Sequence, residues 1–463
     1  MNNYRVIGKS LIRRDGLDKA HGRVRYTDDL RVPGMLYAAV LTSPHAHANI
    51  LSIDTAQAKN APGVRAVVTG QDYPIRLGLY LGDKFPIARN KVRYNGEVVA
   101  AVVADSEKEA HAAVKLINVE YEPLPLVRTP HEALQPNAPI LHEEMDQYAH
   151  IEAILPEPGS NVANRTKIRK GDLQQGLKET EVMIEDDFSL PPGDHVAMEP
   201  RVSIAEIMAD GQVIIHSSTQ APFVARNLMS IFFGIPTGKI TVIAPRLGGG
   251  FGGKAGIQLE GLAYLLSKSV GGRPVRLANS REEDLISSPG RMGLQAKVKL
   301  GATQDGKLTF ADLLYLFDSG AYADYAVNIS RAAATACTGP YRIPHVRCDS
   351  LCLYTNHPFA TAFRGFGHIE LCFAIERAMD LLSEKLGIDP VQLRLINAIQ
   401  AGDSTPTQNV LDQNTGDLAE CLHRTTEMIE WEQGKRIELS ETKVRAKGIG
   451  CLWKAPAIPP NTD

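Results

Sequence analysis

The chain has 463 residues, of which 44% are hydrophobic and 22% are charged, and its net charge is −3. This composition is ordinary for a globular protein, and the length is sufficient for two or more domains. Without an excess of basic residues, the chain offers no global field that would attract nucleic acid. No apolar run approaches the roughly 20 residues of a membrane-spanning helix. We therefore predict neither a nucleic-acid partner nor a membrane span.

The first residues and the cysteines indicate the compartment. Residues 1–6 lack the apolar stretch that a signal peptide contains. The six cysteines are irregularly spaced and form no CxxC pair. This pattern argues against a disulfide framework and against an iron–sulfur cluster held by this chain. We predict a cytoplasmic protein in which most cysteines are buried free thiols.

The N-terminal region mixes strands with a helix. Strands are predicted at 35–41, 98–104 and 118–121, and a helix with one apolar face at 106–117. His45 and His47 stand two residues apart, as metal ligands can, but no further ligand follows them. We therefore interpret them as packed or surface histidines.

Composition changes after residue 121, because seven prolines fall between positions 123 and 158. Such a stretch predicts an extended linker between domains. We place the domain boundary near residue 130 and the end of the linker near residue 160. A short helix at 171–177 and a strand at 182–190 then open the second domain.

The middle of the chain has the pattern of a strand–helix–strand unit. Strands are predicted at 212–217 and 239–244, with a helix at 223–233 between them and another helix at 256–270 after them. Gln220 thus follows one strand at its carboxyl end, where ligands bind in such units. His195 and Glu199, four residues apart, could hold a metal on a helix. The prolines around them disfavour a helix, so a structural polar network is the preferred interpretation.

A glycine-rich stretch, Arg246–Lys254, follows the second of these strands and reads RLGGGFGGK. It fits three interpretations. Its GxGxxG spacing fits a dinucleotide fingerprint, although no acidic residue follows at the required distance. It nearly fits a phosphate-binding loop, but Ala255 replaces the Ser or Thr that would hold magnesium. A tight turn that allows close packing is the structural alternative.

A second stretch, Thr361–Gly367, reads TAFRGFG. Strands are predicted before it at 291–300, 308–316 and 346–353. Helices are predicted after it at 368–386, 391–398 and 412–431, followed by a strand at 447–454.

Together, the two motifs resemble the large subunit of the molybdenum hydroxylases, the xanthine dehydrogenase and aldehyde oxidase family. The resemblance implies an α+β protein in which residues 10–130 form an α/β hammerhead domain and 131–160 a linker. Residues 161–440 would form the first molybdopterin-binding domain, and 441–463 the start of a second. The family's GxGE-like run, which carries the catalytic base glutamate, does not occur in this sequence, so we expect another chain to supply that base.

The resemblance also implies which residues form the site. Gln220 matches a glutamine that hydrogen-bonds an oxo ligand of molybdenum. Gly250, Phe251 and Gly252 match the loop that holds the pterin cofactor. Arg364 matches a loop arginine near the cofactor, and could equally hold its own loop. Gln220, Phe251 and Arg364 would contact the metal's ligands without ligating the metal.

Phe366 matches the aromatic residue that packs against a flat substrate ring, with a core phenylalanine as the alternative. With Gln220 and Arg364 it completes the predicted catalytic set. Gly365 stands where carbon monoxide dehydrogenases have a cysteine, so copper-linked chemistry is not expected. Ala255 and Ala332 replace residues that purine-oxidising members use, and Arg331 is the nearest possible substitute for the second.

The resemblance implies hydroxylation of a C–H carbon in an N-heterocycle or an aldehyde, with water as the oxygen source. The cofactor would be molybdenum–molybdopterin, in the cytosine dinucleotide form usual for bacterial members. Electrons would pass to 2Fe–2S and FAD on partner subunits, and a second molybdopterin-binding chain would complete the site, as in the split subunit of nicotinate dehydrogenase. The alternatives are a truncated or non-catalytic homologue that acts only in assembly, or a phosphate-loop nucleotide-binding enzyme.

Overall fold

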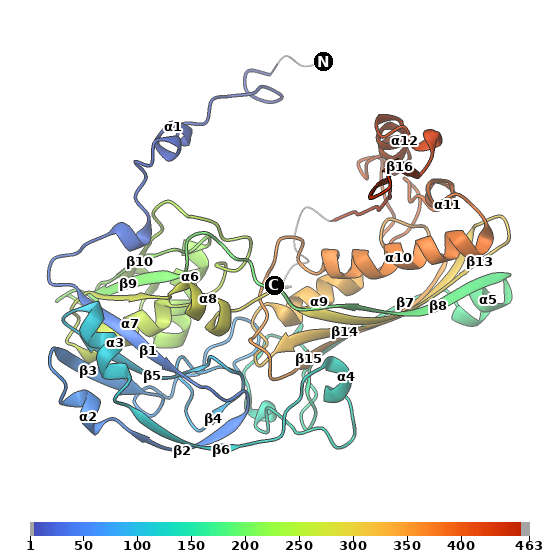
Figure 1. The fold of residues 1–463 in the computed structure, drawn as a ribbon. Helices are drawn as coiled ribbons and strands as arrows, with labels where there is room; N and C mark the ends of the chain where they lie inside the picture. The colour runs from blue at the N-terminus through green and yellow to red at the C-terminus, as the bar shows by residue number, and fades with distance from the viewer. Residues whose placement is uncertain (1–3, 455–463) are drawn as a thin grey trace.

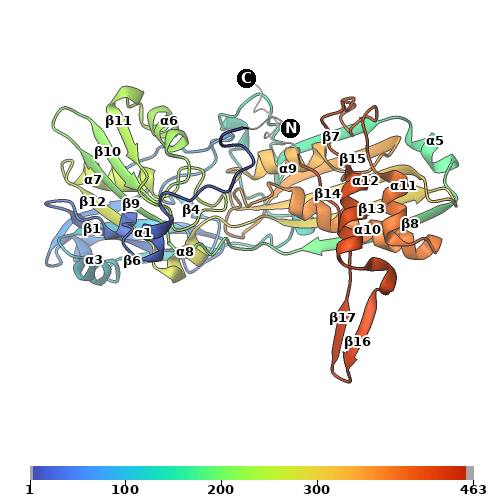
Figure 2. The same cartoon turned by 90° about the horizontal axis from the view of Figure 1, so that it is seen from above.

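Two β-sheets, each in its own lobe, organise the chain (Figures 1 and 2). The structure is a computed structural model, and it describes residues 4–454. One lobe is built from the N-terminal region together with residues 202–278, and the other from residues 162–190 together with segments after residue 293. Helices and strands are both abundant, which fits the α+β class that the sequence predicts.

The first lobe contains a seven-stranded sheet. Its strands are β1 (Leu36–Thr42), β3 (Val64–Thr69), β5 (Val98–Ala104), β9 (Val202–Ile207), β10 (Val213–Ser217), β11 (Ile240–Ile243) and β12 (Val275–Ala278). Their order is β11-β10-β9-β12-β1-β5-β3. The sheet is mixed, since β1 runs parallel to β12 and β10 parallel to β11, whereas the other pairs are antiparallel. The β1–β12 pair places Leu36 opposite Val275 and so joins distant parts of the chain.

Both faces of this sheet are covered, which explains the apolar run of β5. Ala101 and Val103 lie in a core shared with α7 (Glu260–Ser269), whereas Ala100 and Val102 lie in a core shared with α3 (Glu107–Val114). Side chains of a strand alternate between faces, so a strand buried on both sides is apolar throughout. Two more helices, α2 (Ala56–Lys59) and α6 (Pro222–Phe233), complete this lobe.

The second lobe contains a five-stranded sheet. Its strands are β7 (Val162–Lys170), β8 (Val182–Leu190), β13 (Gly293–Ala302), β14 (Leu308–Gly320) and β15 (His345–Tyr354), in the order β7-β15-β14-β13-β8. The long helix α10 (His368–Leu386) lies along this sheet beside α9 (Ala326–Thr335), as Figure 1 shows. Two short helices, α4 (Pro130–Ala133) and α5 (Leu173–Lys178), also contact its strands.

Smaller elements surround the two sheets. A three-stranded sheet is formed by β4 (Lys91–Val92), β2 (Ala48–Asp54) and β6 (Asn118–Pro123). The remaining elements are α1 (Gly16–Ala20), α8 (Arg281–Ser287), α11 (Pro390–Asn397), α12 (Leu418–Met428), β16 (Arg436–Ser440) and β17 (Lys443–Ala446). The hairpin of β16 and β17 projects from the body, as Figure 2 shows.

Most predicted elements are present, and three of them, at 98–104, 182–190 and 368–386, have the predicted bounds. The helix predicted from residue 256 begins only at Glu260, because the carboxylate of Glu260 accepts a hydrogen bond from the Gln258 backbone and ends the preceding loop there. Helices α8 and α9 were not predicted. The Ser280–Glu283 capping box marks the start of α8 and was the available signal.

The C-terminal predictions were partly wrong. Of the helix predicted at 412–431, only α12 forms as an α-helix; it starts at Leu418, and the side chain of Asp417 caps it. No strand forms at 447–454; the strands are instead β16 and β17, and the following segment packs on α10, where Cys451 donates its backbone N–H to Glu376. Residues 455–463 of the predicted 441–463 unit lie outside the described residues.

The segment predicted as a linker is packed into the structure. Leu141, Met145 and Ile154 are buried in the core of the second lobe. Packing of this kind holds the two lobes in a fixed relation. The domain boundaries themselves stay a prediction.

The remaining bulk predictions concern metals, cysteines and membranes. His47 is buried and contacts the carbonyl of Pro125, and the described residues contain no group of His, Cys, Asp and Glu side chains that could hold a metal ion. All six cysteines are free, and four of them are buried. Within residues 4–454, none of the helices has the length and apolar character needed to cross a membrane.

Candidate functional site

Gln220 and the glycine-rich loop meet at one edge of the first sheet. Strand β10, helix α6 and strand β11 form the predicted strand–helix–strand unit, with the two strands parallel and adjacent. Gln220 follows β10, and Arg246–Lys254, which we call the glycine loop, follows β11. The Gln220 backbone N–H donates to the Lys254 carbonyl at 3.0 Å. Its side-chain Oε1 accepts from the Gly252 N–H at 2.9 Å.

The orientation of the Gln220 amide follows from this contact. A backbone N–H can only donate, so the atom that it meets must be the side-chain oxygen. The amide nitrogen Nε2 therefore points elsewhere, and no group among residues 4–454 accepts a hydrogen bond from it. Because Gln220 is exposed, this nitrogen is available to an external acceptor.

The backbone of the glycine loop offers further donors. Gly249, Phe251 and Gly252 have φ angles of 106°, 52° and 104°, in the left-handed range. In the described chain, the N–H groups of Gly249, Gly250 and Phe251 have no acceptor. Successive N–H groups that turn to one side in this way form a concavity suited to an anionic or oxygen-rich group. Phe251 is 46% exposed beside it.

A buried ion pair closes the base of the glycine loop. Lys254 Nζ lies 3.2 Å from Glu199 Oε2 and 2.7 Å from the Glu199 carbonyl. The same Oε2 accepts from the Gly248 N–H at 2.8 Å, and the Glu199 N–H donates to the Gly248 carbonyl at 3.1 Å. Glu199 thus binds both ends of the loop. This confirms the structural network that was preferred for Glu199 over metal binding.

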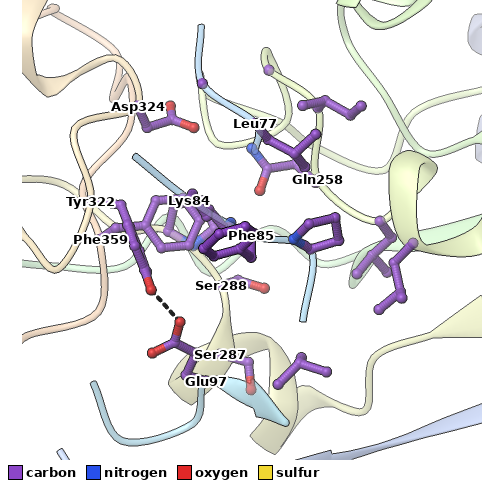
Figure 3. A pocket seen from close by; sticks show the side chains of 18 of the residues that line it. Leu77, Lys84, Phe85, Glu97, Gln258, Ser287, Ser288, Tyr322, Asp324 and Phe359 are labelled. Atoms are coloured by element: carbon purple, nitrogen blue, oxygen red, sulfur yellow. Dashed lines mark hydrogen bonds between the residues drawn. The ribbon is translucent and has the colours of Figure 1, made fainter. Parts of the chain in front are cut away.

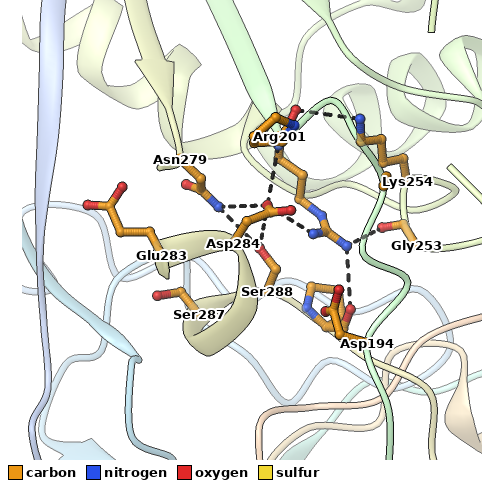
Figure 4. Close-up of polar contacts among 12 residues, drawn as sticks. Asp194, Arg201, Gly253, Lys254, Asn279, Glu283, Asp284, Ser287 and Ser288 are labelled. Atoms are coloured by element: carbon orange, nitrogen blue, oxygen red, sulfur yellow. Dashed lines mark hydrogen bonds and ion pairs between the residues drawn. The ribbon is translucent and has the colours of Figure 1, made fainter. Parts of the chain in front are cut away.

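A second buried pair, Arg201 and Asp284, supports the same loop (Figure 4). The Arg201 guanidinium lies 3.0 Å from Asp284 Oδ1 and donates to the Gly253 carbonyl at 2.8 Å. Asp284 also accepts from Asn279 and Ser288. Burial opposes ionisation of Asp284, but attraction and hydrogen bonds from Arg201 outweigh it, so the pKa of Asp284 is lowered. Sequence reasoning missed this pair, because its two residues are 83 positions apart.

These contacts weigh against the phosphate-loop interpretation. Lys254 is only 2% exposed and is bonded inward to Glu199. Burial lowers the pKa of Lys254, an effect that Glu199 opposes. Helix α7 starts six residues beyond Lys254, and the Glu260 carboxylate already accepts hydrogen bonds at its N-terminus from Ser217 and Gln258. Neither the lysine nor the helix end is therefore free to bind a nucleotide phosphate.

The second motif, Thr361–Gly367, lies against the glycine loop; we call it the arginine loop. A Cβ atom placed on Gly252 would lie 2.4 Å from the Ala362 carbonyl oxygen, so only glycine allows this approach. His195 Nε2 lies 2.7 Å from the same oxygen and therefore donates to it. Its ring also faces Phe363, with ring centroids 4.7 Å apart. His195 thus joins the two loops, and burial lowers its pKa.

The predicted site residues of the arginine loop differ in exposure. Arg364 is exposed and has no hydrogen-bond or ion-pair partner among the described residues, so it does not hold its own loop. Phe366 is 8% exposed, has a φ of 53°, and packs edge-on against Tyr325 at 6.1 Å. In this chain Phe366 therefore lies in the core, as the alternative interpretation expected, and its contact with substrate stays a prediction.

Two residues considered for substrate binding lie near this point. Ala332 is fully buried in α9. Arg331 is partly buried, and its Nη1 lies 3.3 Å from Asn328 Oδ1. Arg331 thus contacts a neutral amide on α9 and forms no ion pair among the described residues.

Taken together, the geometry is a wall made by two loops, with donors and an aromatic side chain on its open side. The residues that match a molybdopterin cofactor-binding domain are 154–398, more than half of the chain. Residues 21–125 match the a/b hammerhead domain of aldehyde oxidase and xanthine dehydrogenase. The chain belongs to this family of molybdenum-dependent hydroxylases.

Comparisons with individual proteins support the same family. The chain is 35% identical to a probable xanthine dehydrogenase subunit of Bacillus subtilis, over 89% of this chain and 53% of that protein. It is 32% identical to the nicotinate dehydrogenase large molybdopterin subunit of Eubacterium barkeri, over 92% of this chain and 96% of that subunit. The aldehyde oxidoreductase of Desulfovibrio gigas superimposes with a TM-score of 0.82 at 28% identity, over 90% of this chain and 46% of that one. The chain thus spans about half of some relatives and nearly all of another.

Proposed function

We propose that this chain is the large molybdopterin-binding subunit of a hydroxylase that oxidises a C–H bond of an N-heterocycle or an aldehyde, with water as the oxygen source. The observation that carries the proposal is the open side of the two loops. There, the amide nitrogen of the exposed Gln220 and the guanidinium of the exposed Arg364 are available to an oxygen-rich, anionic ligand, and the N–H groups of Gly249, Gly250 and Phe251 have no acceptor among the described residues. A molybdopterin has this chemistry.

The residues present fit such a cofactor. Backbone donors at Gly249–Phe251 would hold oxygen or phosphate groups, Gln220 Nε2 would donate to an oxo ligand, and Arg364 would add a positive charge. The side chain of Phe251 would cover one side of the cofactor. When bound, the molybdenum centre would supply the two-electron redox chemistry of hydroxylation. The chain's own residues bind and orient; none of those at the wall is placed as the base.

The partners follow from the same proposal. A second molybdopterin-binding chain would supply the base carboxylate and the rest of the cofactor site, and subunits with 2Fe–2S and FAD would carry the electrons away. The near-complete match to a relative named as the large molybdopterin subunit supports a divided arrangement of this kind. We also propose the cytosine dinucleotide form of the cofactor and a cytoplasmic location, which the six free cysteines support.

Metal and nucleotide analysis of the native complex tests the proposal. The complex is isolated with its partner chains and assayed for molybdenum, pterin and cytosine nucleotide, and then for oxidation of nicotinate, xanthine and simple aldehydes with an artificial electron acceptor. We expect about one molybdenum per chain and turnover of one substrate class. A folded complex without molybdenum or pterin would instead support a non-catalytic homologue and would overturn the proposal.

A further inference from the structure

A cavity of about 90 Å³ is lined by residues from both lobes. Four segments far apart in sequence line it: the loop 77–86, residues 256–262 after the glycine loop, residues 287–289 after α8, and residues 322–324. Phe359 closes it beside Lys84 (Figure 3). No residue of either loop lines the cavity, but two of its lining residues contact the loops: Arg201 donates to the Gly253 carbonyl, and Asp324 accepts from the Thr361 hydroxyl.

Several polar atoms at the cavity lack partners within residues 4–454. Lys84 Nζ lies 3.7 Å from the centroid of the Phe359 ring and has no hydrogen bond or ion pair. Asp324 Oδ1 accepts from the Tyr325 N–H and from Thr361 Oγ1, both at 2.7 Å, which leaves Oδ2 free. The buried atoms Gln258 Nε2 and Ser287 Oγ also have no partner. Buried polar atoms left in this way destabilise the fold unless something binds them.

Volume and charge together identify the occupant. An engineered dry, apolar cavity of about 150 Å³ binds benzene, whereas this cavity is smaller and is lined partly by polar groups, so water fits it better than an aromatic ring. Asp324, Glu97 and Asp83 all attract the Lys84 ammonium, so groups of both signs surround the cavity. One water needs roughly 10–15 Å³ of such space, so the cavity has room for about six to nine waters. A water cluster can bridge both the ammonium and the carboxylate.

We propose that this cavity is a hydrated proton store for the catalytic site, in which Asp324 exchanges protons with the arginine loop through the Thr361 hydroxyl and with the water cluster that extends to Lys84. This inference rests on the proposed function. Hydroxylation converts a C–H group and one water into a C–OH group, two protons and two electrons. The electrons go to the iron–sulfur and flavin carriers, whereas the protons need an acceptor close to the loops.

The position of Asp324 suits this role. Its carboxylate touches Thr361, the first residue of the arginine loop, and its Oδ2 lies near Gly256, two residues after the glycine loop. Burial raises the pKa of Asp324, an effect that Thr361, Lys84 and Arg201 oppose, and Asp83, one of the acids nearby, has a pKa raised to about 7. Asp324 is therefore an acid that can bind a proton under conditions where an exposed aspartate would not.

Infrared spectroscopy of the purified protein tests the proton store without the cofactor. We expect the carbonyl stretch of a protonated, deuterium-exchangeable carboxylic acid, and the component due to Asp324 should vanish in Asp324→Asn. Asn is isosteric and tolerates the left-handed φ of 35° at this position, so the variant should fold. Asp83→Asn is the matched control, since it should remove a different component. If Asp324→Asn leaves the spectrum unchanged, the proposal fails.

The bridging water is tested through Lys84. Removal of its charge in Lys84→Met should raise the titration midpoint of the Asp324 band by about one pH unit, whereas Lys84→Arg should leave it nearly unchanged. A crystal structure at high resolution should show ordered water between Lys84 Nζ and Asp324 Oδ2. A dry cavity, a direct ion pair, or an unshifted midpoint in Lys84→Met would each overturn the inference.

Activity then separates this inference from the proposed function. In the assembled enzyme, Asp324→Asn should shift the pH profile of kcat and leave KM for the substrate unchanged, because Asp324 handles protons and does not touch the substrate. If the protein shows the infrared band of Asp324 but contains no molybdenum and has no turnover, the proton-store proposal stands and the proposed hydroxylase function is contradicted. If Asp324→Asn turns over substrate with the same pH profile as the wild type, the proposed hydroxylase function stands and the proton-store proposal is contradicted.

Discussion

The two loops that form the wall are held in place by different forces. The glycine loop has an exposed tip, and its base is fixed by two buried ion pairs, Glu199–Lys254 and Arg201–Asp284. The arginine loop is fixed mainly by burial of Phe366 in the core and by the Thr361–Asp324 hydrogen bond. A loop made of glycines has no side chains of its own to bury, so its position must be set by polar groups from its neighbours. The predictions below test this difference.

The largest effect is expected from Glu199→Ala, which would leave the Lys254 ammonium buried without its partner. We expect the free energy of unfolding to fall by about 3–5 kcal/mol, as measured by urea denaturation. The double variant Glu199→Gln with Lys254→Met removes both charges, so its free energy of unfolding should fall by less than that of Glu199→Ala. Glu420→Ala, which breaks an exposed i,i+4 pair with Arg424, is the control and should cost under about 1 kcal/mol. If Glu199→Ala and Glu420→Ala lower the free energy of unfolding by similar amounts, the buried Glu199–Lys254 pair does not fix the glycine loop.

The contact between the loops is tested by Gly252→Ala. The new methyl group would meet the Ala362 oxygen at 2.4 Å, at a residue whose φ is 104°, and we expect a loss of about 3 kcal/mol in unfolding free energy. Gly271→Ala is the matched control, because its φ is 72° and the space around it is open; strain alone should cost about 1 kcal/mol there. Equal losses would mean that the loops move apart freely.

The two loops should also respond to pH in opposite directions. The pKa of Asp284 is lowered from 3.8 in the folded protein, so its stabilisation is present above that value and is lost as pH falls through the folded pKa. The pKa of Asp324 is raised from 3.8, so its contribution is largest below that value and is lost as pH rises through the folded pKa. Unfolding curves of Asp284→Asn and Asp324→Asn between pH 3 and 8 should therefore differ from the wild type with opposite slopes.

The smallest effect on stability, with the largest effect on function, is expected at the open side. Gln220→Ala and Phe251→Ala should each change the free energy of unfolding by at most about 1 kcal/mol. In the assembled enzyme, turnover should fall by roughly tenfold or more, because a donor to the cofactor or its cover is lost. Gln304→Ala, at an exposed turn of the second lobe, should leave turnover unchanged. Normal turnover in both site variants would contradict the site assignment.

The sequence predicted several of the elements around the candidate site because the signals there are local. Runs of apolar residues predicted the strands β5 and β8, and apolar residues at helical spacing predicted α10. The strand–helix–strand pattern placed Gln220 and the glycine loop after two neighbouring strands. The two motifs were sufficient for the family. Helix α9 was not predicted; its buried residues include the polar Asn328 and Ser330 beside several alanines, so a stripe of large apolar side chains does not mark its buried surface.

The contacts that hold the site could not be predicted in the same way. Arg201 meets Asp284, and Lys84 reaches the same cavity as Asp324, only because distant segments are brought together by the sheets. The glycines of the loop were predicted to face a cofactor, but Gly248 and Gly252 are required by close approach to Glu199 and Ala362. Spacing along a chain carries no information about such encounters.

By itself, the sequence determined the family and the α+β class, because these depend on local motifs and on the apolar patterns of neighbouring residues. Only the tertiary structure decided that Lys254 is a buried structural cation, that Phe366 lies in the core, and that residues from both lobes line a polar cavity. The physical reason is that burial, which sets the charge state and the free energy of each of these groups, is created only when the two lobes close around them.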